Sequence, residues 1–168
     1  KEIEFGLKNR IFTFNVESIP ELLVLNQLAE KHNQKANVAI RLNPNVNAKT
    51  HHYITTGLEE NKFGINYWEL ADLFETLDAC QHIHLRGLHF HIGSQIRDLE
   101  VFKNLCNRVN QLQKEFKERN IDLDHINVGG GLGVNYTNPD SELVPDFEKF
   151  FGIFDILLLL IHSCDFPL

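Results

Sequence analysis

The chain has 168 residues, of which 43% are hydrophobic and 23% are charged, a balance typical of a globular protein and not of a disordered or membrane protein. Its formal net charge of −7 argues against a broad basic surface for nucleic acid or for an anionic membrane. These values favour a small-molecule or protein partner.

The cysteines, the first ten residues and the length of the apolar runs indicate the cellular compartment of the protein. Cys80, Cys106 and Cys164 are an odd number at wide spacings without a C-x-x-C motif, so they suggest neither a disulfide framework nor a thiolate zinc site. The first ten residues have mixed charge and lack the apolar segment of a secretory signal. The longest apolar run, residues 156–161, is far shorter than the roughly 18–20 residues of a membrane span. We therefore expect a cytoplasmic protein.

Short runs of β-branched and aromatic residues alternate with longer segments of helical period. This alternation predicts an α/β fold in which βα units surround a parallel sheet. Ser18, followed three residues later by Glu21, predicts the N-terminal cap of the first helix. We expect helices at residues 20–32, 67–79 and 99–119. We expect strands at residues 11–17, 38–43, 84–91 and 124–129.

Polar side chains lie on one face of three predicted strands, near the C-terminal ends. Because strand side chains alternate between the two faces, they lie opposite the branched residues of the same strands. Ligands of parallel α/β proteins bind at these ends. The residues are Arg41 and Asn43 on the second strand, His89 and His91 on the third, and His125 and Asn127 on the fourth.

A glycine run directly follows the fourth predicted strand, with four glycines in residues 129–133. Without side chains, consecutive backbone N–H groups can turn toward an anion, so the run predicts a phosphate cradle. It is neither a dinucleotide-binding fingerprint nor a P-loop, because its later positions do not match either motif. A flexible connection between strand and helix is the alternative interpretation.

The third predicted strand ends in His89-Phe90-His91, and Ser94 follows. An imidazole can stack on a flat ligand and a serine hydroxyl can bond a phosphate oxygen. Two alternatives remain: structural histidines, or a metal-dependent barrel hydrolase, which would need further ligands at later strand ends. His51, His52 and Lys62 belong to a long loop-like segment, where solvated roles are expected.

Five short sequence motifs are more specific in combination than any one of them is alone. They are R-L-N-P-N-V at 41–46, Y-I-T-T-G at 53–57, N-K-F-G at 61–64, G-L-H-F-H-I-G-S-Q at 87–95 and V-G-G-G-L-G-V at 128–134. In this order and spacing they resemble the diaminopimelate decarboxylase family, pyridoxal-phosphate enzymes of the alanine-racemase-like barrel class. The glycine run and the His-x-Gly-Ser element alone would also suit related ornithine, arginine or carboxynorspermidine decarboxylases.

The resemblance implies a (β/α)8 barrel that binds pyridoxal 5'-phosphate at the C-terminal ends of its strands, followed by a β domain. It implies decarboxylation of the amino acid meso-2,6-diaminopimelate to L-lysine by a homodimer. It also implies roles for individual residues: His91 would stack on the pyridine ring, Ser94 would bond the phosphate, and Arg41 would lie near the ring hydroxyl. Gly129, Gly130 and Gly131 would cradle the phosphate, with Asn43, Lys62 and His89 supporting the pocket.

The chain also departs from the family pattern. No lysine stands in the Tyr-x-x-Lys-Ala-Asn context of the lysine that forms the Schiff base, and no Glu-x-Gly-Arg motif follows the glycine run. Many relatives carry Asp at the position of Asn127. A whole barrel takes about 250 residues. We therefore expect an internal fragment, inactive by itself: residues 1–154 as the central part of the barrel, 155–168 as an atypical tail from truncation or a frameshift, and no β domain. The alternative is a catalytically dead regulatory homologue.

Overall fold

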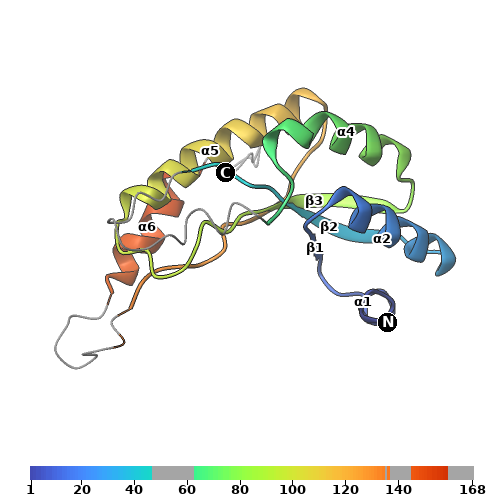
Figure 1. Ribbon diagram of the computed structural model, residues 1–168, viewed down its shortest axis with the longest axis horizontal. Coiled ribbons are helices and arrows are strands. Elements are labelled where there is room, and N and C mark those ends of the chain that lie inside the picture. Colours follow the sequence, from blue (N-terminus) through green and yellow to red (C-terminus); the bar gives the residue numbers. More distant parts are fainter. Residues whose placement is uncertain (47–62, 135, 137–144, 159–168) are drawn as a thin grey trace, which may run out of the picture.

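The computed structural model describes residues 1–46, 63–134, 136 and 145–158 (Figure 1). These residues form one parallel sheet whose strands lie in chain order, β1-β2-β3-β4. The strands are β1 (Phe14–Val16), β2 (Ala36–Arg41), β3 (Ile83–His89) and β4 (His125–Asn127). The helices are α1 (Glu2–Lys8), α2 (Ile19–Lys31), the 3-10 helix η1 (Tyr67–Glu69), α4 (Leu70–Ala79), α5 (Glu100–Glu118) and α6 (Phe147–Leu157). The predicted α/β class and the four consecutive strands are confirmed.

The core lies between the sheet and its helices, and α4 and α5 lie along one side of the strands (Figure 1). Val38, Ile40 and Leu88 are fully buried there. Helix α5 contributes an apolar stripe whose members are buried: Val101, Phe102, Leu105, Val109, Leu112 and Phe116. This face of the sheet is apolar, so the polar residues of the alternating pattern belong to the opposite face.

Helix α2 begins as its sequence predicts. The Ser18 hydroxyl accepts a hydrogen bond from the Glu21 backbone N–H at 3.3 Å, which satisfies one of the unpaired donors at a helix start. The Glu21 carboxylate accepts a second bond from the backbone N–H of Glu17 at 2.8 Å. The first turn of α2 thereby fixes the chain as it leaves β1.

Helices α1 and α6 have no counterpart among the predicted elements. Asp146 caps α6 by accepting from the Lys149 N–H at 2.9 Å. Phe150 and Phe154 of α6 meet Phe102 of α5 edge-on, with ring centroids 4.9 and 6.1 Å apart. The predicted atypical tail lies outside the described residues from position 159 onward.

The first, third and fourth predicted strands are too long, and the second has the right length but is displaced by two residues. Strand β3 also contains an irregularity that the sequence pattern did not indicate. Val38 pairs with Leu85 but Ala39 pairs with Gly87, so Arg86 is an extra residue, which defines a β-bulge. A Cβ at Gly87 would lie 1.9 Å from the carbonyl oxygen of His125. The close approach of β4 therefore requires glycine at this position.

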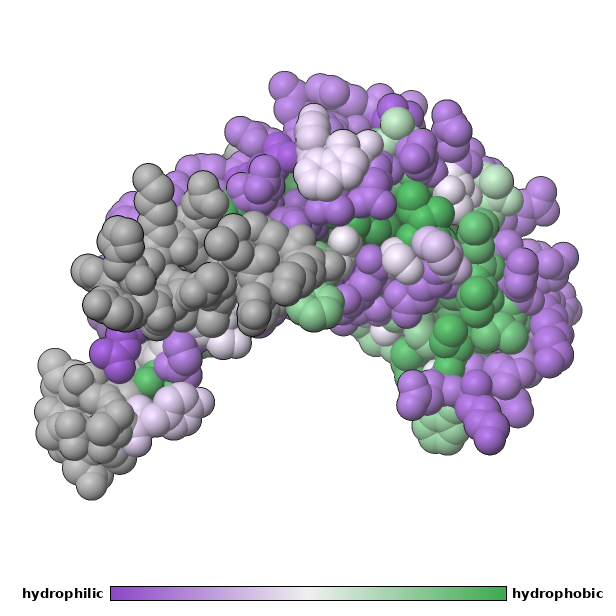
Figure 2. Space-filling view, in the orientation of Figure 1, coloured by the Kyte–Doolittle hydropathy of each residue, from purple (hydrophilic) through white to green (hydrophobic). Residues whose placement is uncertain are grey.

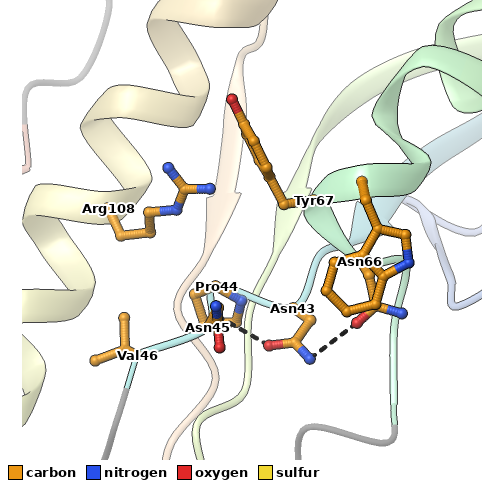
Figure 3. Close-up of a pocket in the computed structure, with 8 residues that line it drawn as sticks. Asn43, Pro44, Asn45, Val46, Asn66, Tyr67 and Arg108 are labelled. Atoms are coloured by element: carbon orange, nitrogen blue, oxygen red, sulfur yellow. Dashed lines mark hydrogen bonds between the residues drawn. The ribbon is translucent and has the colours of Figure 1, made fainter.

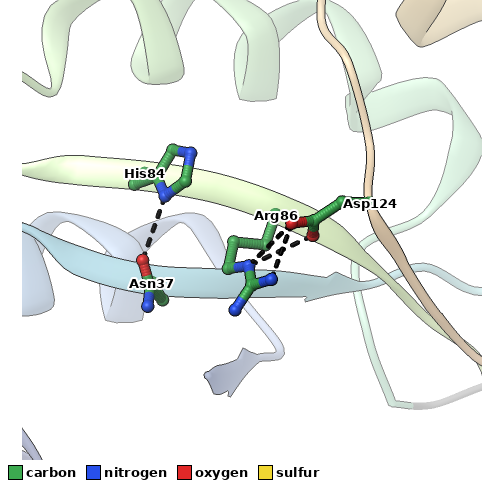
Figure 4. A network of polar contacts seen from close by, with 4 residues as sticks. All are labelled: Asn37, His84, Arg86 and Asp124. Carbon is green, nitrogen blue, oxygen red and sulfur yellow. Dashed lines mark hydrogen bonds and ion pairs between the residues drawn. The ribbon is translucent and has the colours of Figure 1, made fainter. Parts of the chain in front are cut away.

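Arg86, the extra residue of the bulge, binds Asp124 and so links the start of β4 to β3 (Figure 4). Its guanidinium donates to both carboxylate oxygens of Asp124, at 2.6 Å from Nη2 to Oδ2 and 3.1 Å from Nε to Oδ1. The Asp124 backbone N–H donates to the Arg86 carbonyl at 2.8 Å. Nearby, Asn37 on β2 and His84 on β3 are hydrogen bonded at 3.0 Å.

Hydrophobic side chains also reach the surface. Figure 2 shows them gathered over α2, where Leu23 and Val24 are more than 40% exposed. Phe5 of α1 and Phe151 of α6 are exposed as well. Within the described ranges, none of the helices combines the length and hydrophobicity that a bilayer span requires.

Candidate functional site

A row of polar side chains crosses the sheet at the C-terminal ends of its strands. The strand register pairs Arg41 of β2 with His89 of β3, and His89 with Asn127 of β4. Since Val16 pairs with Ile40, Glu17 comes next to Arg41 on the other side. The row Glu17–Arg41–His89–Asn127 is therefore fixed by the backbone of the sheet.

Arg41 is the central cation of this row. Its Nη1 lies 2.7 Å from Oε1 of Glu17, and its side chain is only 11% exposed. A guanidinium this far from water needs such a partner, because an unpaired buried charge is strongly destabilising. The Phe63 ring centroid lies 5.4 Å from the guanidinium carbon. The ion pair therefore holds Arg41 in a defined place at the strand end.

His89 is a neutral imidazole with one unsatisfied nitrogen. Burial lowers the pKa of His89 to about 4, and the positive charge of Arg41 adds to the effect; His91 and His125 act the same way, while Glu17 opposes them. Its Nδ1 is buried and makes no hydrogen bond within the described part of the chain. A buried polar atom without a partner is rare and is a position where a ligand atom can bind.

The loops that follow β3 and β4 lie side by side. Phe90 donates its backbone N–H to the Asn127 carbonyl at 2.8 Å, and Ile96 donates to Gly131 at 2.8 Å. Gly133 in turn donates to Ile96 at 2.9 Å. These bonds join the H-F-H-I-G-S-Q string to the glycine run, which are more than 30 residues apart in sequence.

Gly129 and Gly131 combine a left-handed backbone with a close approach of the neighbouring loop, so both positions require glycine. Gly129 and Gly131 have φ values of 74° and 97°, which L side chains rarely adopt. A Cβ at Gly131 would lie 2.1 Å from the Gly93 carbonyl oxygen, and one at Gly129 would lie 2.5 Å from that of Phe90. At Gly130 a Cβ would meet nothing within 4 Å. This bare, exposed backbone fits the phosphate of a cofactor.

The structure brings most of the predicted site residues to this edge of the sheet. His91 lies against the glycine run, since its Nδ1 would be 2.9 Å from a Cβ on Gly129. Ser94 is exposed on the loop joined to the run. The Gly129 N–H donates to the Asn127 side-chain oxygen at 2.9 Å, so this amide is already used within the loop. Lys62, His51 and His52 lie outside the described residues.

Asn43 lines a separate pocket of about 460 Å³ between the end of β2, η1 and α5 (Figure 3). Its side chain donates to the Asn66 oxygen at 3.2 Å and accepts from the Asn45 N–H at 2.9 Å. Across the pocket, the Arg108 guanidinium lies 4.5 Å from the Tyr67 ring centroid. Asn43 thus orders the turn after β2.

Glu17 is a site residue that the sequence pattern missed. Glu17 follows β1 directly, and the pairing of β1 with β2 is what places it beside Arg41. For the metal alternative, the described ranges contain no group of three or more His, Cys, Asp or Glu residues that could hold a metal ion.

The comparisons with known proteins show the family to which the chain belongs. Residues 1–154 match the pyridoxal-binding domain of the pyridoxal-dependent decarboxylases. The chain therefore belongs to this family, whose cofactor is pyridoxal phosphate.

Diaminopimelate decarboxylases are among the relatives of the chain within this family. The chain is 52% identical to diaminopimelate decarboxylase of Bacteroides thetaiotaomicron over 153 residues, which are 91% of this chain and 40% of that protein. It is 39% identical to the Aquifex aeolicus diaminopimelate decarboxylase over 145 residues, covering 86% of this chain and 34% of that one. The chain thus spans about 40% or less of the length of these relatives.

Solved structures of diaminopimelate decarboxylases are also similar to this chain. Diaminopimelate decarboxylase of M. jannaschii superposes with a TM-score of 0.78 at 34% identity, covering 95% of this chain and 38% of that one. The Helicobacter pylori enzyme complexed with L-lysine gives a TM-score of 0.75 at 39% identity, covering 94% and 40%. Both are similar to this chain along part of their length.

Proposed function

We propose that this chain is part of a diaminopimelate decarboxylase, which converts meso-2,6-diaminopimelate to L-lysine and carbon dioxide. The observation that carries the proposal is the pairing of the two loops, which brings His91 and Ser94 to a glycine run whose Gly129 and Gly131 tolerate no side chain. Similarity to enzymes of that name at 39–52% identity supports the substrate.

In this proposal the residues of the chain bind and orient the cofactor. Ser94 and the backbone at Gly130 and Gly131 hold the phosphate, the His91 ring lies against the pyridine ring, and Arg41 lies near the ring hydroxyl. When bound, pyridoxal phosphate supplies a sink for the electrons of the broken carbon–carbon bond. The contribution of the chain is orientation, together with the fixed cation of Arg41 and the neutral imidazole of His89 at the strand ends.

The proposal also covers the Schiff-base lysine and the rest of the intact enzyme. No lysine of this chain stands in the full Tyr-x-x-Lys-Ala-Asn context, since Lys35-Ala36-Asn37 has His32 in place of the tyrosine. Lys35 also precedes β2, at the end of the strand opposite the site, so the chain by itself does not suffice for turnover. We propose that residues 1–154 are a central part of the barrel and that the intact enzyme is a cytoplasmic homodimer with a further β domain.

The test uses the intact protein that carries this sequence. Incubated with pyridoxal phosphate and meso-diaminopimelate, it is expected to release carbon dioxide and form L-lysine. L-Ornithine, L-arginine and carboxynorspermidine serve as alternative substrates. Preferential turnover of one of these would replace the proposed substrate while keeping the family. Binding of the cofactor without turnover of any of them would instead identify a catalytically inactive homologue.

A further inference from the structure

The feature that the proposed roles leave unused is the Nδ1 atom of His89. It is buried without a hydrogen-bond partner in the described part of the chain, at the end of β3 and in register with Arg41. With the pKa of the ring lowered to about 4, the imidazole is neutral and one of its nitrogens carries a proton. Beside the Arg41 cation, an electron-rich oxygen is a favourable partner for that N–H.

Glu17 determines where the Arg41 cation lies. Its carboxylate lies 2.7 Å from Nη1 of Arg41. Its own backbone N–H is held at 2.8 Å by Glu21, in the first turn of α2. The helix start therefore fixes Glu17, and Glu17 fixes the guanidinium beside His89.

We propose that Glu17 is a positioning residue that orients Arg41 beside His89, and that the Nδ1–H of His89 donates to the ring oxygen of bound pyridoxal phosphate. This inference rests on the proposed function, because it takes the cofactor ring to lie at the strand ends near Arg41. The contact assigned to His89 is distinct from the contact of His91 with the ring face and from the binding of the phosphate at the glycine run, and Glu17 acts on it through Arg41.

A positioning role and a purely electrostatic role for Glu17 predict opposite results. The carboxylate is a negative charge close to the site, so if charge alone mattered, Glu17→Gln would tighten binding of an anionic oxygen. If Glu17 orients Arg41, the same substitution weakens binding, since the amide holds a guanidinium less firmly than a carboxylate does. The sign of the change therefore separates the two roles.

The experiment compares two ligands on the intact protein: pyridoxal 5'-phosphate and its 3-deoxy analogue, which lacks the ring oxygen. Dissociation constants are measured by absorbance titration for the unaltered protein, Glu17→Gln and His89→Phe. Glu100→Gln is the matched control, because Glu100 forms an exposed ion pair with Lys103 on α5 at 2.5 Å, away from the strand ends. For each variant, both dissociation constants are measured on the same preparation and their ratio is compared. Unfolded protein affects both measurements equally and therefore does not change the ratio.

We expect the unaltered protein and Glu100→Gln to prefer the natural cofactor. Glu17→Gln and His89→Phe should each lose about tenfold in affinity for it, the scale of one hydrogen bond to a charged group, and little for the analogue. Glu17→Asp and His89→Gln, which keep a carboxylate and an N–H donor, should recover part of the preference.

Three results would overturn the inference. If the variants lose the same affinity for both ligands, Glu17 and His89 have only a structural role. If they lose no affinity for either ligand, the two residues are not part of the site. If Glu17→Gln binds pyridoxal 5'-phosphate more tightly than the unaltered protein does, Glu17 acts through its negative charge and not by orienting Arg41. In each of these cases the proposed function survives, because the unaltered protein binds the cofactor. If the unaltered protein binds neither ligand, the proposed function fails and the inference fails with it.

Discussion

Individual residues of the site differ in what they serve, and His91 and His82 form an informative pair. His91 lies against the glycine run, whereas the His82 backbone is bonded to Asn26 of α2 at 2.9 Å, before β3 begins. In the intact enzyme, His91→Ala should lower turnover by roughly ten- to thousandfold, about 1.4–4 kcal/mol of barrier, and shift the cofactor absorbance. The melting temperature of the cofactor-free protein should change little.

His82→Ala is the control and should alter neither turnover nor absorbance. If His91→Ala instead unfolds the protein while the folded fraction keeps normal activity, His91 is a core histidine and its assignment to the cofactor is wrong.

Gly131 and Gly130 are neighbours with opposite tolerance for a methyl group. Gly131→Ala places a Cβ 2.1 Å from the Gly93 carbonyl at φ 97°, so the loops must separate. A loss of more than about 1 kcal/mol of unfolding free energy is expected, measured by thermal or urea unfolding. Gly130→Ala meets nothing within 4 Å and should leave the melting temperature unchanged. Equal effects at both positions would contradict the observed loop geometry.

His89 couples the site to pH. Its pKa in the folded state, about 4, is below the unfolded value of about 6.5, so between these values the unfolded chain binds more protons. The contribution of His89 should therefore lower stability as pH falls from 6.5 to 4 and be constant above 6.5. His89→Phe should flatten this part of the stability profile. An NMR titration in which the His89 ring protonates near pH 6.5 would disprove the shift.

At the scale of elements, the Arg86–Asp124 pair holds the start of β4. Arg86 lowers the pKa of Asp124 through their hydrogen bonds, so the pair stabilises the fold above the ordinary aspartate pKa and this contribution is lost as pH falls through the lowered value. Because Asp124 is largely exposed, Asp124→Asn should cost less stability than Gly131→Ala. Hydrogen exchange should show faster opening of β4. Unchanged exchange in β4 would show that its backbone pairing alone holds the strand.

Helices with a strong local signal could be predicted from the sequence, and the strand irregularity could not. The Ser18 cap and the α5 stripe depend on residues a few positions apart, so their pattern is visible in the chain itself. The bulge at Arg86 depends on how closely β4 approaches Gly87, which is a contact between distant segments. Helix α6 is held by Phe102 of α5, again a distant partner.

The same distinction holds for the site. Alternation along β2 and β3 placed Arg41 and His89 on one face, and the register brings them together. Glu17 was missed because its role comes from the pairing of β1 with β2, not from its own strand pattern. The Asn127 bond to the Gly129 amide depends on a turn geometry that composition does not indicate.

At the scale of the whole molecule, the described sheet has two outer strands, β1 and β4. Unpaired strand edges and exposed apolar side chains favour association, and Leu23, Val24 and Phe12 are exposed. Expressed by itself, the 168-residue chain should form aggregates or a molten state, seen by light scattering. A monomer with sharp, dispersed amide resonances would contradict this expectation.

The isolated chain should also be insufficient for catalysis. Incubated with pyridoxal phosphate and meso-diaminopimelate, it should release no carbon dioxide, because a positioned, partly deprotonated lysine is needed and no lysine has the full family context. The reference is a preparation whose lysines are chemically blocked. Release above that reference would show that a lysine of this chain suffices.

The hydrogen bonds between the loops after β3 and β4 have a consequence for ligand design. Ile96 is bonded to both Gly131 and Gly133, so a residue inserted or deleted between the strand ends and these bonds would displace one loop relative to the other. The same bonds limit how far the His91 ring can move from the glycine backbone. If the cofactor binds as proposed, with its ring at His91 and its phosphate at the glycine run, an analogue with a second methylene group between ring and phosphate should bind more weakly than pyridoxal phosphate, as measured by absorbance titration.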